Sequence, residues 1–262
     1  MRIVCCIKQV PETGNVEIDK ETNNLIRDSV ESILNPMDSY AIEEALRIKE
    51  RCCDVEIIVL TMGPPQAENI LREAISLGVD RAIHLSDRKF AGADTLATSH
   101  TLSQAIKNIG EVDLVICGKQ AIDGDTAQVG PGISEILGIP LLNYVRKIEE
   151  ISDDSIVCER LLEDGYEVIK APLPALITVV KEINEPRLPS LRGKMKARSA
   201  EILSWKACDL SEDTSRYGIG GSPTSVVKIF TPKHRSNGIM LRGEADDMAK
   251  QLAKHLKEDL KI

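Results

Sequence analysis

The chain has 262 residues, with 33 basic and 41 acidic side chains, and its net charge of −8 disfavours general binding to nucleic acid phosphates. Aromatic residues make up 3% of the chain, too few for the stacking surfaces on which single-strand binders depend. Its apolar runs are far shorter than the roughly 20 residues that cross a bilayer, so we expect no membrane insertion and a cytoplasmic location.

The seven cysteines and four histidines show no spacing typical of a metal site. The cysteine count is odd, no two cysteines form a CxxC pair, and the adjacent Cys5 and Cys6 point to opposite faces of a strand. We therefore predict small buried thiols in a reducing compartment. The sequence also indicates no catalytic acid, base or nucleophile.

Short β-rich runs alternate with helical patterns over the first 140 residues. The predicted buried strands cover residues 2–10, 55–62, 81–86 and 113–118, and the predicted helices follow Asn35-Pro36 and cover 64–77 and 93–109. Such alternation predicts crossover connections and an α/β fold with a mostly parallel sheet. Ligands bind such sheets beyond the carboxyl ends of the strands, so the loops after Val10, Met62 and Gly118 are candidate sites.

The pattern changes after residue 140. Residues 156–162 and 166–171 flank Glu163-Asp164-Gly165, which predicts a hairpin. A further β-prone run covers residues 175–181 and predicts another strand.

The last part of the chain is poor in periodic apolar residues. Residues 185–243 contain too few of them for a core of their own, so we expect an extended arm that leans on another surface, most simply another chain. A terminal helix is predicted over 244–260, where one face carries Met248, Leu252, His255 and Leu256.

The loop after the fourth predicted strand is the richest stretch of the chain. Residues 118–132 read GKQAIDGDTAQVGPG and lead into a helix, which Pro131 predicts to begin after Asp125. Glycines let backbone N–H groups approach a ligand, a helix N-terminus offers donors to a phosphate, and Lys119 adds charge. The pattern is neither Walker A nor GxGxxG, and a loop in which Asp123 or Asp125 caps the helix explains it equally well.

A local basic stretch stands out in this acidic chain. It contains no acidic residue and consists of Arg187, Arg192, Lys194, Lys196 and Arg198. Leu188, Leu191 and Met195 interleave with these charges, a mixture that suits contact with protein better than with RNA. A docking surface and a solvated run of charges are equal interpretations of these residues alone. The later Gly218-Ile219-Gly220-Gly221 stretch follows no predicted strand and favours a turn over a phosphate cradle.

Taken together, these pieces resemble the β subunit of an electron-transfer flavoprotein over essentially the whole chain. The matching motifs are Lys8-Gln9-Val10-Pro11, Asn35-Pro36, Met62-Gly63-Pro64-Pro65, Gly118 to Asp123, Asn184-Glu185-Pro186-Arg187 and Lys194-Met195-Lys196-Ala197. The resemblance implies an adenine-nucleotide-binding, Rossmann-like α/β domain over residues 1–184. It also implies that residues 185–262 form a partner-docking loop and an extended C-terminal arm with a terminal helix, which embraces an α subunit.

The resemblance also assigns roles to individual positions. Nucleotide contacts are expected at Cys6, Asn35, Pro36, Met37, Asp38 and Met62. The other nucleotide contacts are expected in one continuous loop, at Gly118, Lys119, Gln120, Ala121, Ile122, Asp123, Gly124, Asp125, Thr126, Ala127, Gln128 and Val129. The loop around Leu191, with its basic neighbours Arg192, Lys194 and Lys196, is expected to dock on a partner dehydrogenase.

Part of this loop divides the family and decides the cofactor. Housekeeping members carry a loop like DDDCNQTGQ and bind a structural AMP, whereas this chain has DGDTAQVGP at residues 123–131. This stretch is similar to that of flavin-based electron-bifurcating members, which hold an FAD there. Gly124 and Ala127 are small, which is compatible with the bulkier ligand. We therefore expect FAD, with AMP as the alternative.

Resemblance to the bifurcating members implies a reaction sequence. NADH would deliver a hydride to the FAD held mainly by this chain, and one electron would pass to ferredoxin or flavodoxin. The other electron would pass through the FAD of the α subunit to a partner dehydrogenase, often one of the acyl-CoA type. The chain is thus expected to work as a subunit of an NADH-oxidising, ferredoxin-reducing complex and to be inactive in isolation. The flavin carries the redox chemistry, while the protein supplies position and electrostatics.

Two rival interpretations share the α/β scaffold. A stress-protein-like nucleotide sensor would be a stable homodimer that needs no α subunit. An ATP-splitting enzyme of the related fold would carry an SGGxDS-type loop after the first strand, where this chain has Gln9-Val10-Pro11-Glu12.

Overall fold

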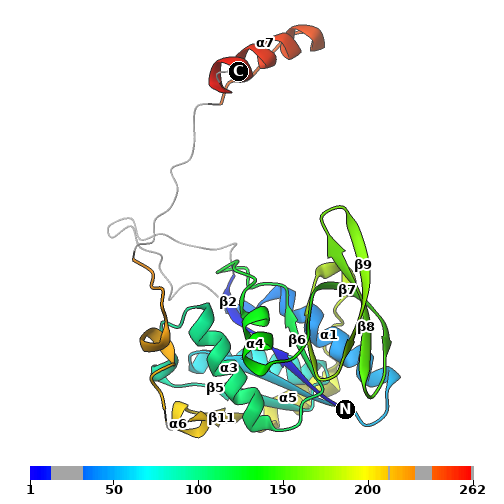
Figure 1. Cartoon of the computed structure of the whole chain (residues 1–262), viewed down its shortest axis with the longest axis vertical. Helices are drawn as coiled ribbons and strands as arrows, with labels where there is room; N and C mark the ends of the chain where they lie inside the picture. Colours follow the sequence, from blue (N-terminus) through cyan, green and yellow to red (C-terminus); the bar gives the residue numbers. More distant parts are fainter. Residues whose placement is uncertain (13–31, 212, 228–237, 261–262) are drawn as a thin grey trace. The chain divides into compact units, whose positions relative to one another are not determined.

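The structure is a computed structural model that describes residues 1–12, 32–211, 213–227 and 238–260 (Figure 1). These residues divide into two units, Met1–Ser225 and Val226–Ile262. The first unit contains all the strands of the main sheet, and the second contains helix α7 (Ala245–Leu260). The terminal helix predicted over 244–260 is therefore present. Among the described residues, no helix combines the length and the apolar character needed to cross a bilayer.

The main sheet contains nine of the described strands, in the order β11-β5-β4-β1-β6-β10-β7-β8-β9. Their bounds are β1 Arg2–Cys6, β4 Glu56–Met62, β5 Arg81–Leu85, β6 Leu114–Gly118, β7 Leu141–Ile151, β8 Ser155–Leu162, β9 Gly165–Pro172, β10 Ala175–Val179 and β11 Leu203–Trp205. The pairings from β11 to β7 are parallel, and only the β7-β8-β9 ribbon is antiparallel. The predicted α/β fold with a mostly parallel sheet is confirmed. A separate antiparallel pair joins β2 (Gln9–Pro11) to β3 (Ser32–Leu34).

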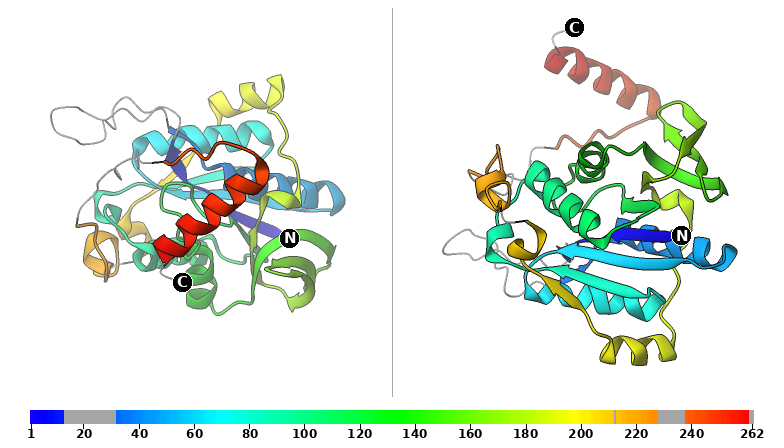
Figure 2. Two further views of the ribbon diagram at one scale, coloured as in Figure 1. Left: turned by 90° about the horizontal axis from the view of Figure 1, so that it is seen from above. Right: turned by 60° about the horizontal axis from the view of Figure 1, so that its bottom comes forward.

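Helices cover both faces of this sheet, and Figure 2 shows the two helical layers on either side of the strands. On one face, the core contains residues from α1 (Pro36–Arg51), α2 (Glu68–Leu77) and α5 (Leu191–Ser199). On the other face, it contains residues from α3 (Thr95–Ile109), α4 (Val129–Leu137) and α6 (Ala207–Leu210). Strands such as β6 and β10 are buried along their whole length, because a parallel sheet between two helical layers has no solvent-facing side.

The strand order reverses direction at β1. The chain leaves β1 through α1 to reach β4 on one side, and it later returns through α3 to place β6 on the other side. In open α/β sheets, ligands bind in the crevice outside the carboxyl ends of the strands at such a switch point. The loops that follow β1 and β6 are therefore the first place to look for a site.

Most of the predicted elements are present, with shifted ends. Helix α1 begins at Pro36 as predicted, whereas the helix predicted over 64–77 begins as a 3₁₀ turn at Pro65–Ala67 and becomes α-helical at Glu68. The predicted hairpin is confirmed, with Leu162 paired to Gly165 across its turn. Strand β7 was not predicted, because its charged and apolar residues do not alternate regularly.

Residues beyond 184, where we expect the docking loop and arm to begin, also contribute to the main sheet and its core. Strand β11 pairs in parallel with β5, and three residues that follow it, Ala207, Leu210 and Tyr217, are buried against the α3 face of the sheet. These short elements need no periodic pattern, because each contributes only one or two apolar side chains to a core built by the earlier strands. The first compact unit runs from Met1 to Ser225, so the described residues after 184 within it pack against their own chain.

Candidate functional site

The candidate site lies at the carboxyl ends of β1 and β6, where Asn35 joins two loops. Asn35 is 1% exposed; its Nδ2 donates to the Gln120 carbonyl at 3.0 Å and its Oδ1 accepts from the Ile122 amide at 3.2 Å. The Asn35 amide donates to the Lys8 carbonyl at 2.9 Å. The Asn35 side chain makes no cap bond at the start of α1 and instead holds the loop after β6 against that helix.

Asp38, in the first turn of α1, is the buried acid of the site. Its Oδ2 accepts a hydrogen bond from the Lys8 amide at 2.7 Å, and its carboxylate also accepts a hydrogen bond from the Gly118 amide. A Cβ on Gly118 would collide with Asp38 Oδ1 and the Met37 backbone, so only glycine allows this approach. Burial raises the pKa of Asp38 to about 7, although hydrogen bonds from Asn35, Lys8 and Gly118 oppose that rise.

Residues 119–128, which we call the α4 loop, run from the end of β6 to the start of α4. The Asp125 amide donates to the Ala121 carbonyl at 2.9 Å, and Asp125 also accepts from Gln120 Nε2. Asp125 and Ala127 both have φ of +53°, so the chain twice takes the left-handed conformation within three residues. Such turns direct successive backbone amides towards one side, an arrangement that binds anions.

The acidic side chains of this loop do not cap α4. Asp123 accepts from Lys8 Nζ through both oxygens at 2.7 Å, and Asp125 is engaged by Gln120. Gln128 is the N-cap residue of α4 and makes no side-chain cap bond, in contrast to Asp94 at the start of α3. The alternative of a loop whose aspartates cap the helix is therefore wrong. Because Pro131 has no N–H and the Gly132 amide donates to the Gln128 carbonyl at 2.9 Å, the donors that this first turn can offer to a ligand are the amides of Val129 and Gly130.

Glycines bring α4 close to its neighbours. A Cβ on Gly130 would lie 2.7 Å from Thr178 Cγ2 on β10, and one on Gly132 would collide with Ser99 on α3. Close packing therefore sets the N-terminus of α4 against the sheet edge. The helix begins at Val129, after Asp125, as Pro131 predicts.

The structure brings the expected nucleotide residues to one edge of the sheet, although at different depths. Asn35, Met37 and Asp38 contact the stretch from Gly118 to Ile122 through the bonds and the close approach described above. Pro36 is the exposed first residue of α1, and Met62 is the half-buried last residue of β4. Cys6 is buried beside Cys117 in the core, where a hydrogen bond with Cys6 together with burial raises the pKa of the Cys117 thiol.

Sequence reasoning missed two residues of this region. Lys8 was recognised only as part of a motif, yet it pairs with Asp123 and binds Asp38 through its backbone. Thr95, at the start of α3, donates through Oγ1 to Gln128 Oε1 at 2.9 Å. An Asp-Thr pair ahead of a helix indicates a cap, but no local pattern predicts a contact 33 residues away.

The expected docking residues form a separate surface. Leu191, Arg192, Lys194 and Lys196 belong to α5, so the expected loop is a helix, begun by Ser190 Oγ accepting from the Gly193 amide at 3.0 Å. Gly193 approaches Ser76 in the last turn of α2, and α2 ends where the strand β5 begins. The docking residues therefore lie towards the amino ends of the strands, away from the α4 loop.

Arg187, counted with the basic stretch in the sequence, is an internal clamp. Its Nε bonds Glu43 Oε2 at 2.7 Å and its Nη1 bonds Glu50 Oε1 at 2.5 Å, both on α1. Burial would raise the pKa of Glu43, but the hydrogen bonds from Arg187 and Arg47 outweigh it and lower that pKa. Arg187 thus fixes the path from β10 to α5 and is not free for a partner.

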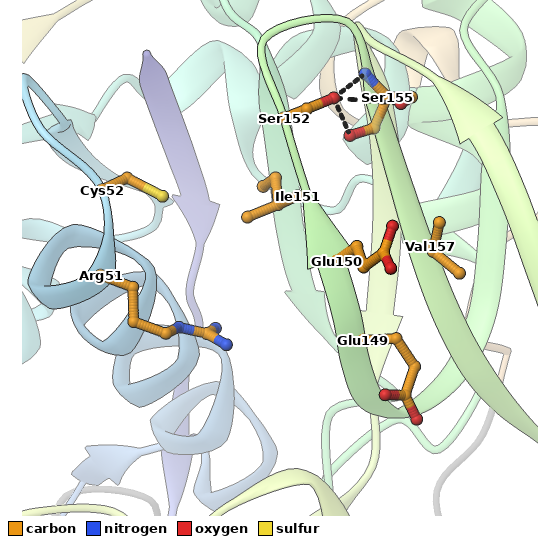
Figure 3. A pocket seen from close by; sticks show the side chains of 8 residues that line it. All are labelled: Arg51, Cys52, Glu149, Glu150, Ile151, Ser152, Ser155 and Val157. Atoms are coloured by element: carbon orange, nitrogen blue, oxygen red, sulfur yellow. Dashed lines mark hydrogen bonds between the residues drawn. The ribbon is translucent and has the colours of Figure 1, made fainter.

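A pocket of about 460 Å³ lies elsewhere, between the end of α1 and the β7-β8 turn (Figure 3). Arg51 and Cys52 face Glu150 and Ile151 across it. Because α1 ends where β4 begins, this pocket is at the amino ends of the strands and shares no residue with the candidate site. Among the described residues, no group of three or more His, Cys, Asp or Glu side chains is placed to hold a metal ion.

Comparison with known proteins assigns this architecture to a class. The family model described as electron transfer flavoprotein domain matches residues 22–210. The chain is 48% identical over 253 residues to the electron transfer flavoprotein subunit beta of Megasphaera elsdenii, covering 94% of this chain and 93% of the relative. It is also 48% identical to the caffeyl-CoA reductase-Etf complex subunit CarD of Acetobacterium woodii, over 98% of each chain.

A third relative has a different name but also matches most of the chain. Protein FixA of Azorhizobium caulinodans is 46% identical over 90% of this chain and 86% of its own length. The chain belongs to the electron transfer flavoprotein family, on the beta-subunit side, and the resemblance found in its motifs is confirmed. These matches leave the nucleotide-sensor and ATP-splitting interpretations without support.

Proposed function

We propose that this chain is the beta subunit of a heterodimeric, electron-bifurcating electron-transfer flavoprotein that holds FAD at the α4 loop. The observation that carries the proposal is the start of α4, which has no side-chain cap and follows a loop with two left-handed residues at the switch point of the sheet. The CarD relative, named for a reductase-Etf complex, supports an electron-transfer role in a larger assembly.

The residues present fit a dinucleotide. The amides of Val129 and Gly130 at the start of α4, together with the turned backbone that follows Asp125, offer donors to a diphosphate. A Cβ on Gly124 would meet no atom within 4 Å, so the loop is open at this position. A monophosphate such as AMP would use the same donors, and the small Gly124 and Ala127 favour the larger ligand.

The chemistry in this proposal belongs to the flavin, which when bound supplies hydride acceptance from NADH and one-electron transfer. The chain itself binds and orients. Asn35 fixes the α4 loop to the start of α1, and Asp38 holds Lys8 and Gly118 at the strand ends. The helix start of α4 stabilises negative charge on the diphosphate.

The proposed partners follow the same assignment. An alpha subunit with its own FAD would receive one electron and pass it to a partner dehydrogenase, often of the acyl-CoA type, and ferredoxin or flavodoxin would receive the other. The dehydrogenase would dock on α5, where Leu191 is 79% exposed among basic side chains. The chain would work in the cytoplasm as a subunit of this NADH-oxidising complex and show no activity alone.

Cofactor counting tests the proposal directly. The heterodimer is purified without added nucleotide and denatured, and the released FAD and AMP are quantified by absorbance and chromatography. Two FAD per heterodimer and no AMP are expected. One FAD with one AMP would replace the bifurcating assignment with the housekeeping alternative.

A further inference from the structure

Residues 218–224, which we call the exit segment, lie at the end of the first unit, just before the chain passes into the second. Asp94 Oδ2 accepts from the Thr224 amide at 3.1 Å and from the Thr224 hydroxyl at 2.9 Å. The Asp94 amide donates to the Ser222 hydroxyl at 2.8 Å. Among the described residues, the hydrogen bonds that tie Ser222 and Thr224 to other parts of the unit all converge on Asp94.

The same carboxylate begins α3. Asp94 Oδ1 accepts from the amides of Leu96 and Ala97, each at 3.0 Å, so one oxygen caps the helix while the other holds Thr224. Hydrogen bonds from Ala97 and Thr224 lower the pKa of Asp94 against the opposing effect of partial burial. The carboxylate is therefore ionised at neutral pH, and both sets of bonds are charge-assisted.

The first turn of α3 also contacts the end of the α4 loop. Thr95 Oγ1 donates to Oε1 of Gln128, the N-cap residue of α4, at 2.9 Å. One turn later, the Ser99 hydroxyl donates to the Thr95 carbonyl at 2.7 Å and to the Val129 carbonyl, at the start of α4, at 3.2 Å. Two adjacent residues, Asp94 and Thr95, thus connect the exit segment to the candidate nucleotide site.

The beginning of the exit segment is packed independently of this connection. The Ile219 amide donates to the Ala91 carbonyl at 3.0 Å. The preceding Tyr217 is 2% exposed, and its ring meets Phe90 edge-on with centroids 5.5 Å apart. Loss of the Asp94 carboxylate would therefore release Thr224, while Ser222 keeps its bond to the Asp94 main-chain amide and this part of the segment stays in place.

We propose that Asp94 and Thr95 couple nucleotide binding at the α4 loop to the order of the exit segment. A nucleotide that restrains Gln128 restrains the first turn of α3 through Thr95, and that turn holds Thr224 through Asp94. Asp94 is a positioning residue, because it acts on the point where the second unit is attached. Coupling free energies are reciprocal, so loosening the exit segment should also weaken nucleotide binding. The inference rests on the proposed function only in requiring a nucleotide at this loop.

The test uses the purified heterodimer, first depleted of the nucleotide of this subunit and then saturated with FAD. We expect FAD to slow amide hydrogen exchange in peptides spanning 218–227 at least about 5-fold, the lower end of usual site-to-site couplings. In Asp94→Asn the side chain still caps α3 but presents an amide group, not an acceptor, to Thr224. The FAD-dependent slowing should be clearly reduced in this variant, although FAD is bound at saturation, because Thr224 loses its acceptor while Ser222 keeps the Asp94 main-chain amide.

Asp87 offers a matched control, since it makes similar bonds nearby without touching the exit segment. Its Oδ1 accepts from the Lys89 amide at 3.0 Å and its Oδ2 from the Ala207 amide at 3.1 Å. Asp87→Asn should loosen residues 206–208. It should leave the FAD-dependent slowing at 218–227 unchanged.

Should Asp94→Asn fail to assemble, Thr224→Val removes a single exposed hydroxyl and carries the test, with a clear reduction of the slowing expected. Wild-type exchange at 218–227 that is equal with and without FAD would overturn the proposal. So would slowing that survives undiminished in every variant that assembles. If AMP slows exchange and FAD does not bind, the coupling stands while the proposed cofactor fails.

Discussion

Asp38 links both the stability of the fold and the candidate site to protonation. Burial raises its pKa from 3.8 to about 7. A group whose pKa is raised by folding binds its proton more tightly in the folded state. Its stabilising contribution is therefore complete below pH 3.8 and is lost as the pH rises through about 7.

For Asp38→Asn, we expect the midpoint of urea unfolding of the heterodimer to lose a component of its pH dependence between about pH 4 and pH 7. A shift of three pKa units corresponds to a contribution on the order of 4 kcal/mol, since one unit is about 1.4 kcal/mol. The variant should therefore gain stability relative to the wild type as the pH rises. The measurement is the unfolding midpoint at several pH values.

Asp87→Asn serves as a control of opposite sign. Backbone hydrogen bonds from Lys89 and Ala207 lower the pKa of Asp87, so its carboxylate loses its stabilising contribution as the pH falls.

One outcome would contradict the prediction for Asp38. If the difference in unfolding midpoint between wild type and Asp38→Asn does not change with pH, Asp38 stays ionised, held by its hydrogen bonds with Lys8 and Gly118.

At the scale of elements, the α4 loop allows the cofactor assignment to be tested without disturbing the fold. Ala127 has φ of +53°, a conformation that asparagine tolerates better than most residues, and a Cβ on Gly124 would meet no atom within 4 Å. The pair Gly124→Asp and Ala127→Asn therefore changes the ligand side of the loop while the backbone keeps its conformation.

We expect this double variant to bind FAD at the α4 loop at least about 10-fold more weakly, a loss of about 1.4 kcal/mol, because it adds volume and negative charge beside the diphosphate. Flavin content per heterodimer and NADH-dependent flavin reduction measure the effect. Gly124→Ala is the matched control, and it should retain the flavin because the position is open. Two FAD with unchanged NADH reactivity in the double variant would contradict this role of the loop.

Helix α5 carries the proposed docking surface, with Leu191 exposed among Arg192, Lys194 and Lys196. An apolar anchor with a charged rim typically contributes affinity through the anchor and association rate through the rim. We expect Leu191→Ala to remove about 1–3 kcal/mol of binding to the partner dehydrogenase. Titration of the heterodimer with the dehydrogenase measures this loss.

Charge reversal at Arg192 and Lys194 provides the comparison within the same helix. These changes should mainly slow association, with a strong dependence on salt, and should leave FAD content intact. Lost flavin with normal dehydrogenase affinity would instead place α5 at the nucleotide site. That outcome would also conflict with the position of Gly193 beside the last turn of α2.

At the scale of the whole molecule, the elements that depend on local patterns were predictable. The apolar strands β1, β4, β5 and β6 form continuous runs, and Asp164-Gly165 marks the β8-β9 turn. The start of α1 at Pro36 follows from the restricted φ of proline. Strand β7 escaped prediction because its outward side chains, including Lys147 and Glu149, interrupt the apolar alternation.

The short elements after residue 184 depended on surfaces built elsewhere in the chain. Strand β11 has three residues, and α6 has four, so neither is long enough to show a period. Both are ordered because β5 offers an edge and α3 offers an apolar face. A segment with too few apolar residues for a core of its own can therefore still complete a core that other elements build.

By itself, the sequence determined the α/β class, the parallel sheet, the loop after β6 and the family, because apolar periodicity, turn residues and motifs are local properties. The tertiary structure decided which distant groups meet. Asn35 reaches Gln120, and Asp94 reaches Thr224, across 85 and 130 residues respectively. Such bonds form only after the packing of the sheet and helices has brought their loops together, so no local pattern encodes them.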